Sequence, residues 1–141
     1  MNVYADTSFF VSLYVSDAHS TEVERRLAAH PRIWFTPLHR AECEHAIARL
    51  VFLRKLSATE SQDVYRDLEH DRATGLWSAA ELPEQVWDTC SQLARRHGPR
   101  LGTRTLDTLH VACALELKAG RFWSFDDRQL KLAAAAGLKT S

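Results

Sequence analysis

The chain has little of what marks a secreted, membrane-spanning or strongly charged protein. Its three cysteines, Cys43, Cys90 and Cys113, are odd in number and far apart. They indicate neither a disulfide framework nor a CxxC zinc site, and we expect free thiols in a reducing cytoplasm. The eighteen basic residues balance eighteen acidic ones, so any binding of nucleic acid must use a local patch. The N-terminus lacks the features of a signal peptide, and no apolar run is long enough to cross a membrane.

The remaining composition is that of an ordinary globular domain, and we expect residues 1–141 to form a single one. The 141 residues are 45% apolar and 26% charged, which suffices for a real core. Strands are expected at 2–5, 33–35, 76–79 and 122–125. Helices are expected between and after them, at 9–14, 20–29, 37–53, from 58 onward, 83–98, 105–119 and 127–136. This alternation predicts a three-layer α/β/α fold with a mostly parallel central sheet.

Two helix starts and one loop have distinctive composition. Thr36 and Pro37 suit the N-cap and first position of a helix, and Ser57 with Glu60 forms a capping box. Residues 95–104 contain several arginines together with Gly98, Pro99 and Gly102. We expect this segment to be a basic, flexible loop.

Four acidic residues stand where apolar segments end: Asp6, Glu42, Asp107 and Asp126. In an open parallel sheet, ligands bind beyond the carboxyl ends of the strands, and Asp6 and Asp126 each follow an expected strand. Two bare carboxylates about 5 Å apart repel by roughly 3 kcal/mol at an effective dielectric constant near 20. A converging set therefore needs a counterion, and all-oxygen ligands favour Mg²⁺ or Mn²⁺.

Each acid also has a purely structural interpretation. Asp6 and Asp126 can cap helices, and Asp107 suits the first turn of a helix, where the dipole favours an anion. Glu42 fits such an interpretation least, because it shares a helical stripe with Leu38 and other apolar residues, where an unpaired carboxylate is costly. Glu44 lies on a mixed face of the solvent type, so we choose Glu42 over Glu44.

The pattern resembles the PIN-domain ribonucleases, especially VapC-type toxins of bacterial toxin–antitoxin pairs. The resemblance is carried by Tyr4-Ala5-Asp6-Thr7-Ser8, Ala41-Glu42, residues 104–112 (RTLDTLHVA) and Ser124-Phe125-Asp126. It covers nearly the whole chain, and its motifs are specific only in their combined order and spacing. It implies that Asp6, Glu42, Asp107 and Asp126 are the catalytic metal ligands, supported by the Ser8 hydroxyl. At the last position the adjacent Asp127 is also an acid, so the family pattern aligns with either Asp126 or Asp127, and we choose Asp126.

The resemblance implies an Mg²⁺- or Mn²⁺-dependent endoribonuclease that hydrolyses RNA. It also implies a cognate antitoxin as partner and a homodimer, for which residues 9–15 and 47–53 offer apolar surface. Arg95, Arg96, Arg100 and Arg104 precede Asp107 and are candidates for binding substrate phosphates. A solvated loop explains the same arginines equally well.

Other interpretations remain open. A PIN nuclease of RNA processing and a non-catalytic PIN-like binding module share the expected fold, although a binding module usually lacks one or more of the acids. A haloacid-dehalogenase phosphatase needs D-x-D after its first strand, where this chain has Asp6-Thr7-Ser8, and the acid pattern of a receiver domain is also missing. His39 and Cys43 have metal-like spacing without a second pair, and His110 either orients Asp107 or packs. The four tryptophans suit the core or a dimer interface better than base stacking.

Overall fold

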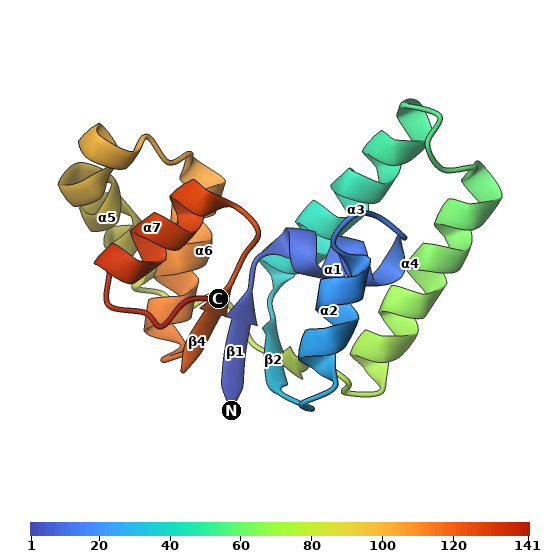
Figure 1. Cartoon of the computed structure of the whole chain (residues 1–141), viewed down its shortest axis with the longest axis horizontal. Helices are drawn as coiled ribbons and strands as arrows, with labels where there is room; N and C mark the ends of the chain where they lie inside the picture. The colour runs from blue at the N-terminus through green and yellow to red at the C-terminus, as the bar shows by residue number, and fades with distance from the viewer.

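A computed structural model describes all residues, 1–141, and its centre is a parallel sheet of four strands in the order β3-β2-β1-β4 (Figure 1). The strands are β1 (Asn2–Ala5), β2 (Arg32–Phe35), β3 (Ser78–Ala79) and β4 (Arg121–Trp123). Val3 of β1 is in register with Ile33 of β2, and Tyr4 is in register with Phe122 of β4. The central position of β1 explains why its residues 3–5 are fully buried.

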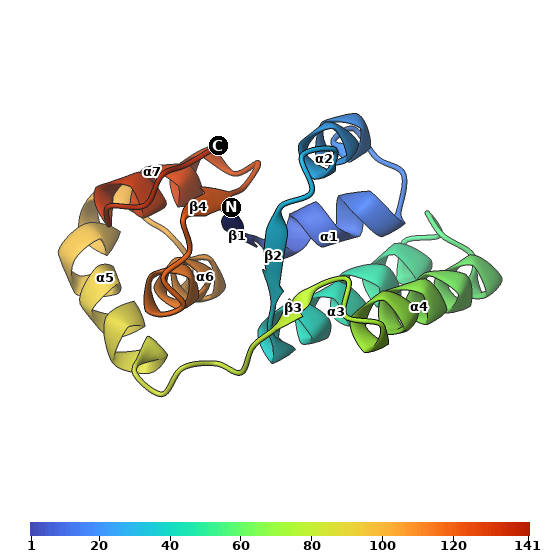
Figure 2. The same cartoon turned by 90° about the horizontal axis from the view of Figure 1, so that it is seen from below.

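The helices form two groups on opposite sides of the sheet (Figures 1 and 2). One group contains α1 (Thr7–Tyr14), α2 (Ser20–Leu27), α3 (Pro37–Phe52) and α4 (Ala58–Ala73). The other contains α5 (Val86–Leu101), α6 (Thr105–Glu116) and α7 (Asp127–Ala135). The predicted three-layer α/β/α fold with a parallel sheet is therefore confirmed.

Alternation along the strands divides the core between these two groups. Val3 and Ala5 belong to an apolar cluster with α1 residues such as Phe9 and Phe10. Tyr4 belongs to a second cluster with residues of α5, α6 and α7. Successive side chains of a strand point to opposite faces, so this short buried strand anchors both layers. Phe9 and Phe10 are core residues and offer no surface for a dimer.

The predicted helix starts are confirmed by their caps. Thr36 caps α3 with Pro37 at the first helical turn, and Ser57 and Glu60 form a capping box at α4. Capping side chains satisfy backbone N–H groups that the first turn of a helix leaves unpaired. The same geometry occurs at Asp6 and Asp126, which cap α1 and α7.

The predicted flexible loop at residues 95–104 is wrong over most of its length, and the preceding helix starts later than expected, at Val86 rather than near Pro83. Helix α5 continues through Gly98 and Pro99 to Leu101. The helix ends instead at Gly102, whose φ of 64° is left-handed and whose N–H donates to Gly98 O at 2.8 Å. Glycine is favoured at such a position because it lacks a Cβ.

The last residues of the chain extend the sheet beyond β4. Phe122 N–H donates to Lys139 O at 2.7 Å, and Ser141 N–H donates to Phe122 O at 3.1 Å. The carboxyl-terminal segment thus lies parallel to β4. None of the helices combines the length and apolar character needed to span a membrane.

Candidate metal centre

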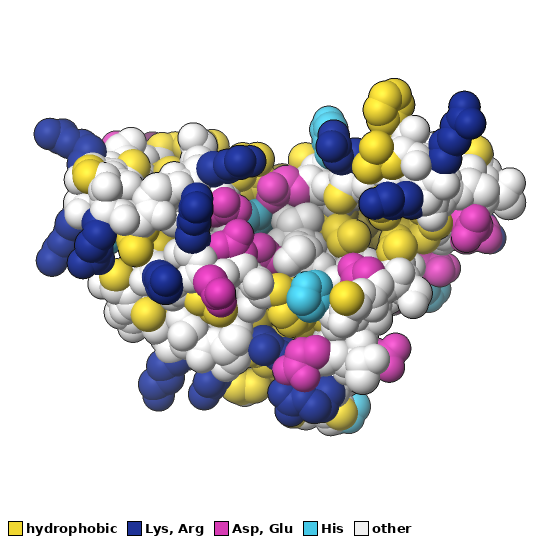
Figure 3. Space-filling model, turned by 45° about the horizontal axis from the view of Figure 1, so that its top comes forward, with side chains coloured by type: hydrophobic (Ala, Val, Ile, Leu, Met, Phe, Trp, Pro, Cys, Tyr) yellow, Lys and Arg dark blue, Asp and Glu magenta, His cyan; other side chains and the backbone are white.

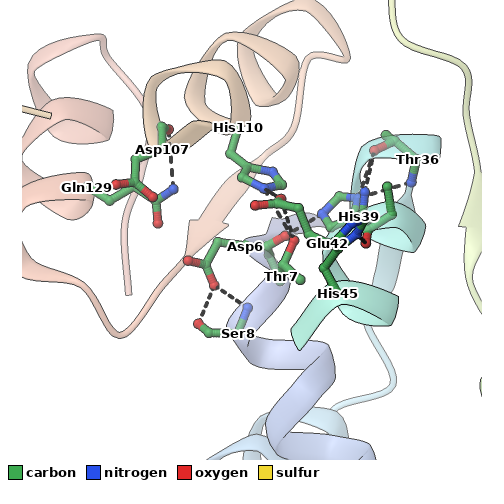
Figure 4. A network of polar contacts seen from close by, with 12 residues as sticks. Asp6, Thr7, Ser8, Thr36, His39, Glu42, His45, Asp107, His110 and Gln129 are labelled. Atoms are coloured by element: carbon green, nitrogen blue, oxygen red, sulfur yellow. Dashed lines mark hydrogen bonds and ion pairs between the residues drawn. The ribbon is translucent and has the colours of Figure 1, made fainter. Parts of the chain in front are cut away.

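The acidic residues gather at the carboxyl ends of β1 and β4, between the two helical groups. Asp6 follows β1 directly, and its N–H donates to Trp123 O, the last residue of β4, at 3.0 Å. Asp126 follows β4 after two residues, Asp107 lies in the first turn of α6, and Glu42 lies on α3. Figure 3 shows acidic side chains together in a hollow at the middle of one face, and Figure 4 shows the labelled residues in detail.

Asp6 uses one carboxyl oxygen as a helix cap. Its Oδ1 accepts from the Ser8 N–H at 3.0 Å and from the Ser8 hydroxyl, which leaves Oδ2 without a hydrogen bond to protein (Figure 4). Burial raises the pKa of Asp6, and the Ser8 hydrogen bonds oppose this rise only in part. Ser8 therefore supports the Asp6 side chain, and the capping role leaves a free oxygen for a ligand.

Asp126 and Asp107 also keep carboxyl oxygens free. Asp126 Oδ1 accepts from the Gln129 N–H at 3.0 Å, and neither oxygen of Asp107 has a hydrogen bond within the protein. Burial raises the pKa of Asp107, and the negative charges of Asp126 and Asp6 raise it further. No Lys or Arg lies within 4.0 Å of the carboxylates of Asp6, Asp107 or Asp126. These three acids thus repel one another without an ion pair to Lys or Arg, and His110 opposes the rise in the pKa of Asp6 and Asp107 only in part.

Glu42 is held differently, because its Oε1 accepts from the Thr7 hydroxyl at 2.8 Å and from His110 Nε2 (Figure 4). Burial raises the pKa of Glu42, but the hydrogen bond and charge of His110, together with the Thr7 bond, lower it overall. Glu44 is exposed and pairs with Arg40 at 3.4 Å. The choice of Glu42 over Glu44 from the helix face agrees with this placement.

Gln129, which the sequence analysis did not select, builds the site together with Ser124 and His110. The buried Gln129 donates from Nε2 to Asp107 O at 3.2 Å, and its Oε1 accepts from Ser124 at 2.7 Å, so it ties α6 to the loop before α7. Ser124 Oγ in turn accepts from the Asp126 N–H at 3.0 Å. Gln129 is three residues after the N-cap Asp126, the position of the second residue of a capping box. This spacing was the only feature of the sequence that could have indicated a role for Gln129. His110, expected to orient Asp107 or to pack, is buried and packs against the rings of Tyr4 and His39. It also makes polar contacts with Glu42, Thr7 and Tyr4.

The carboxyl oxygens of the four acids are ligands of the type that a hard cation prefers. The side chains do not, however, surround a single point as metal ligands do. No three His, Cys, Asp or Glu side chains lie close enough together to hold a metal ion. The four acids that the sequence predicts as metal ligands therefore converge on one region without forming a ready-made set of ligands around one point. His39 is no ligand either, because its buried ring bonds Ala5 O at 2.7 Å and Thr36.

A cavity of about 550 Å³ opens beside Asp107 and Asp126. Its lining residues are Gly102, Thr103, Arg104, Asp107, Phe125, Asp126, Asp127 and Arg128. Of the four arginines selected from the sequence, only Arg104 lines it. Arg95, Arg96 and Arg100 are exposed on α5, and Arg96 borders a different pocket that faces α6 and α7. Arg128, which was not selected, places a second guanidinium at the acidic cavity.

Comparison with known proteins assigns the family. Residues 3–135 match the PIN domain, so the chain belongs to the PIN-domain family. No curated protein sequence matches the chain.

Solved structures agree with this assignment at the level of the fold. VapC20 of Mycobacterium tuberculosis, a toxin that cleaves the sarcin–ricin loop, is 17% identical with a TM-score of 0.70, covering 96% of this chain and 95% of that one. FitAcB of Neisseria gonorrhoeae is 15% identical with a TM-score of 0.74, covering 98% and 95%. VapBC2 of Rickettsia felis, bound to a DNA fragment from its promoter, is 15% identical with a TM-score of 0.66, covering 100% and 98%. The predicted resemblance to VapC-type PIN proteins is thus confirmed.

Proposed function

We propose that the protein is a metal-dependent endoribonuclease that binds Mg²⁺ or Mn²⁺ through Asp6, Glu42, Asp107 and Asp126. The observation that carries the proposal is the gathering of Asp6, Asp107 and Asp126 at one sheet edge with free carboxyl oxygens and no ion pair to Lys or Arg. Burial and the charges of Asp126 and Asp6 raise the pKa of Asp107 accordingly. Carboxylates that crowd at the carboxyl ends of parallel strands repel one another, so they need positive charge nearby. Their free oxygens are the ligands that a hard divalent cation prefers. Membership of the PIN-domain family supports the nuclease activity.

Each residue has a distinct task in this proposal. Asp6, Glu42, Asp107 and Asp126 would hold the divalent ion, which would supply a bound water of lowered pKa and positive charge for the departing oxygen of a phosphodiester. Ser8 fixes one oxygen of Asp6 and so directs the other toward the site. Gln129 fixes α6 relative to α7 and thereby the spacing between Asp107 and Asp126. Arg104 and Arg128 are the candidates for holding RNA phosphates.

We further propose that the nuclease acts as the toxin of a toxin–antitoxin pair. The fold shared with VapC20, which is a toxin, and with VapBC2 supports this role. Its partners are then RNA as substrate and an antitoxin protein, and we propose a homodimer. Phe52 and Leu53 at the end of α3 are 82% and 43% exposed and provide apolar surface for such contacts.

Asp6→Asn tests the proposed activity. Asparagine keeps the size and one oxygen of the side chain but removes the charge that holds a hard cation. We expect the wild-type protein to cut RNA in Mg²⁺ or Mn²⁺, to stop in EDTA, and to lose at least about 100-fold in rate on this change. Gel analysis of RNA fragments measures the rate, and circular dichroism checks the fold.

Glu44→Gln is the matched control, because Glu44 is an exposed acid on α3 outside the acidic site. It should cut like the wild type. Undiminished cleavage by folded Asp6→Asn protein contradicts the role of Asp6 as a metal ligand. Expression in cells tests the toxin role separately. The wild type should slow growth and Asp6→Asn should not, whereas a protein that cleaves without harm indicates RNA processing.

A further inference from the structure

Glu42 is connected to the protein interior through a chain of hydrogen bonds that no other acid of the site shares. His110 Nε2 contacts the Glu42 carboxylate (Figure 4). On the other side of the ring, His110 Nδ1 lies 2.7 Å from the Tyr4 hydroxyl. The Tyr4 side chain is fully buried and the His110 side chain is 3% exposed, whereas the Glu42 side chain is 24% exposed. The chain therefore runs from the core to the edge of the acidic site.

The Glu42 carboxylate fixes the direction of the first hydrogen bond. An ionised carboxylate only accepts, so His110 Nε2 is the donor to Glu42. The Tyr4 hydroxyl can donate or accept, so it holds Nδ1 in either form of the ring. Thr7 Oγ1 donates to the same carboxyl oxygen at 2.8 Å. Two donors from two elements thus hold one oxygen, Oε1, while no protein group holds Oε2.

We propose that His110 and Tyr4 are positioning residues, which fix the Glu42 carboxylate so that its second oxygen is available to the metal. This inference rests on the proposed function. Glu42 comes from the α1–α4 group of helices, whereas His110 and Asp107 come from α6 in the other group. The bond between His110 and Glu42 consequently sets how far Glu42 stands from Asp107 across the site. Removal of a residue that holds a metal ligand through a hydrogen bond commonly weakens metal affinity by about 10- to 100-fold.

The neighbouring His39 is a buried histidine whose hydrogen bonds are purely structural. The rings of His39 and His110 are 5.1 Å apart, and both side chains are buried. His39 bonds only Ala5 O and Thr36 and reaches no acid. His39 is therefore an internal control for the loss of a buried imidazole near the site.

The experiment measures Mn²⁺ binding to metal-free protein by calorimetry, together with thermal unfolding in EDTA. His110→Leu keeps the bulk of the side chain but removes the donor, and we expect Mn²⁺ affinity to fall by about 10- to 100-fold. His110→Gln should restore most of this affinity, because the Gln amide can place a donor near the position of Nε2. Tyr4→Phe should give a smaller loss in the same direction. His39→Gln should lower the melting temperature and leave Mn²⁺ affinity unchanged.

The outcomes separate this inference from the proposed function. A wild-type protein that binds no Mn²⁺ and cuts no RNA overturns both. A wild-type protein that binds Mn²⁺, with folded His110→Leu protein binding it equally well, overturns only the positioning role. Equal losses in His39→Gln and His110→Leu also overturn it, because they indicate a general effect of core disruption. If His110→Leu does not fold, Tyr4→Phe decides, and wild-type affinity in this variant contradicts the role of the Tyr4 hydroxyl.

Discussion

The two sides of the acidic site differ in how the protein treats its carboxylates. On the α3 side, Glu42 has two side-chain donors and a lowered pKa. On the α6 and α7 side, Asp107 has no side-chain donor, and its pKa is raised by burial and by Asp126 and Asp6. The fold thus stabilises one acid and leaves the others in mutual repulsion. A site with uncompensated charge costs stability in the metal-free protein, which is typical of functional sites.

The largest effect on stability is expected from Glu42→Gln. This change removes the charge that accepts from His110 and Thr7 and leaves those buried donors with a weaker partner. We expect metal-free protein to lose about 1–3 kcal/mol in its free energy of unfolding. Urea denaturation in EDTA measures this loss. An unchanged midpoint for Glu42→Gln would show that the hydrogen bonds to Glu42 contribute little.

Asp107→Asn should have a smaller effect of opposite sign. The amide removes one charge from the repelling set, so metal-free protein should gain stability. The gain should stay below about 1 kcal/mol, because Asp107 is partly exposed and solvent screens the repulsion. The same denaturation assay applies, with Asp67→Asn on the exposed face of α4 as a control for removing an acid that has no ion pair. Destabilisation by Asp107→Asn would mean that the carboxylate has a stabilising partner.

The pH dependence should follow the same division. A carboxyl with a lowered pKa in the folded state contributes stability above its unfolded pKa and loses it as pH falls through the folded value. A carboxyl with a raised pKa lowers stability as pH rises from its unfolded value through the folded one. The stability differences of both variants from the wild type should therefore be largest near about pH 7 and should shrink below about pH 4. Differences that persist in acid would show that shape, not charge, causes them.

The smallest effect concerns RNA affinity. Arg104→Gln and Arg128→Gln should each weaken RNA binding a few-fold and reduce its salt dependence, because each guanidinium faces the acidic cavity. Arg95→Gln on the exposed surface of α5 is the matched control and should change little. Fluorescence anisotropy with a short RNA at two salt concentrations distinguishes them. An equal or larger loss for Arg95→Gln would place the RNA along α5.

Much of the fold could be predicted from local sequence signals. Capping residues and short apolar runs located the strands and most helix starts, and Glu42 was selected because a carboxylate in an apolar stripe needs a partner. The ends of helix α5 could not be predicted from such local signals. Gly98 and Pro99 are usual stop signals, but packing of Leu93 and His97 carries the helix to Leu101. Tertiary contacts override local propensity at such points.

The detailed polar network was beyond sequence reasoning for a different reason. His110, Tyr4 and Thr7 lie on different elements, and each has an ordinary structural explanation on its own. Their bonds depend on how β1, α1, α3 and α6 are placed relative to one another. Arg128 was missed similarly, because only the fold brings the first turn of α7 to the cavity that Arg104 also lines.

The most direct test of the metal site is anomalous diffraction from crystals grown with Mn²⁺. We expect an anomalous peak at the carboxyl ends of β1 and β4, contacted by free oxygens of Asp6 and Asp107 and by at least one of Glu42 and Asp126. The peak should vanish in Asp6→Asn crystals grown under the same conditions. A well-ordered wild-type structure at saturating Mn²⁺ with no peak among these acids, or with Mn²⁺ bound elsewhere, would contradict the account.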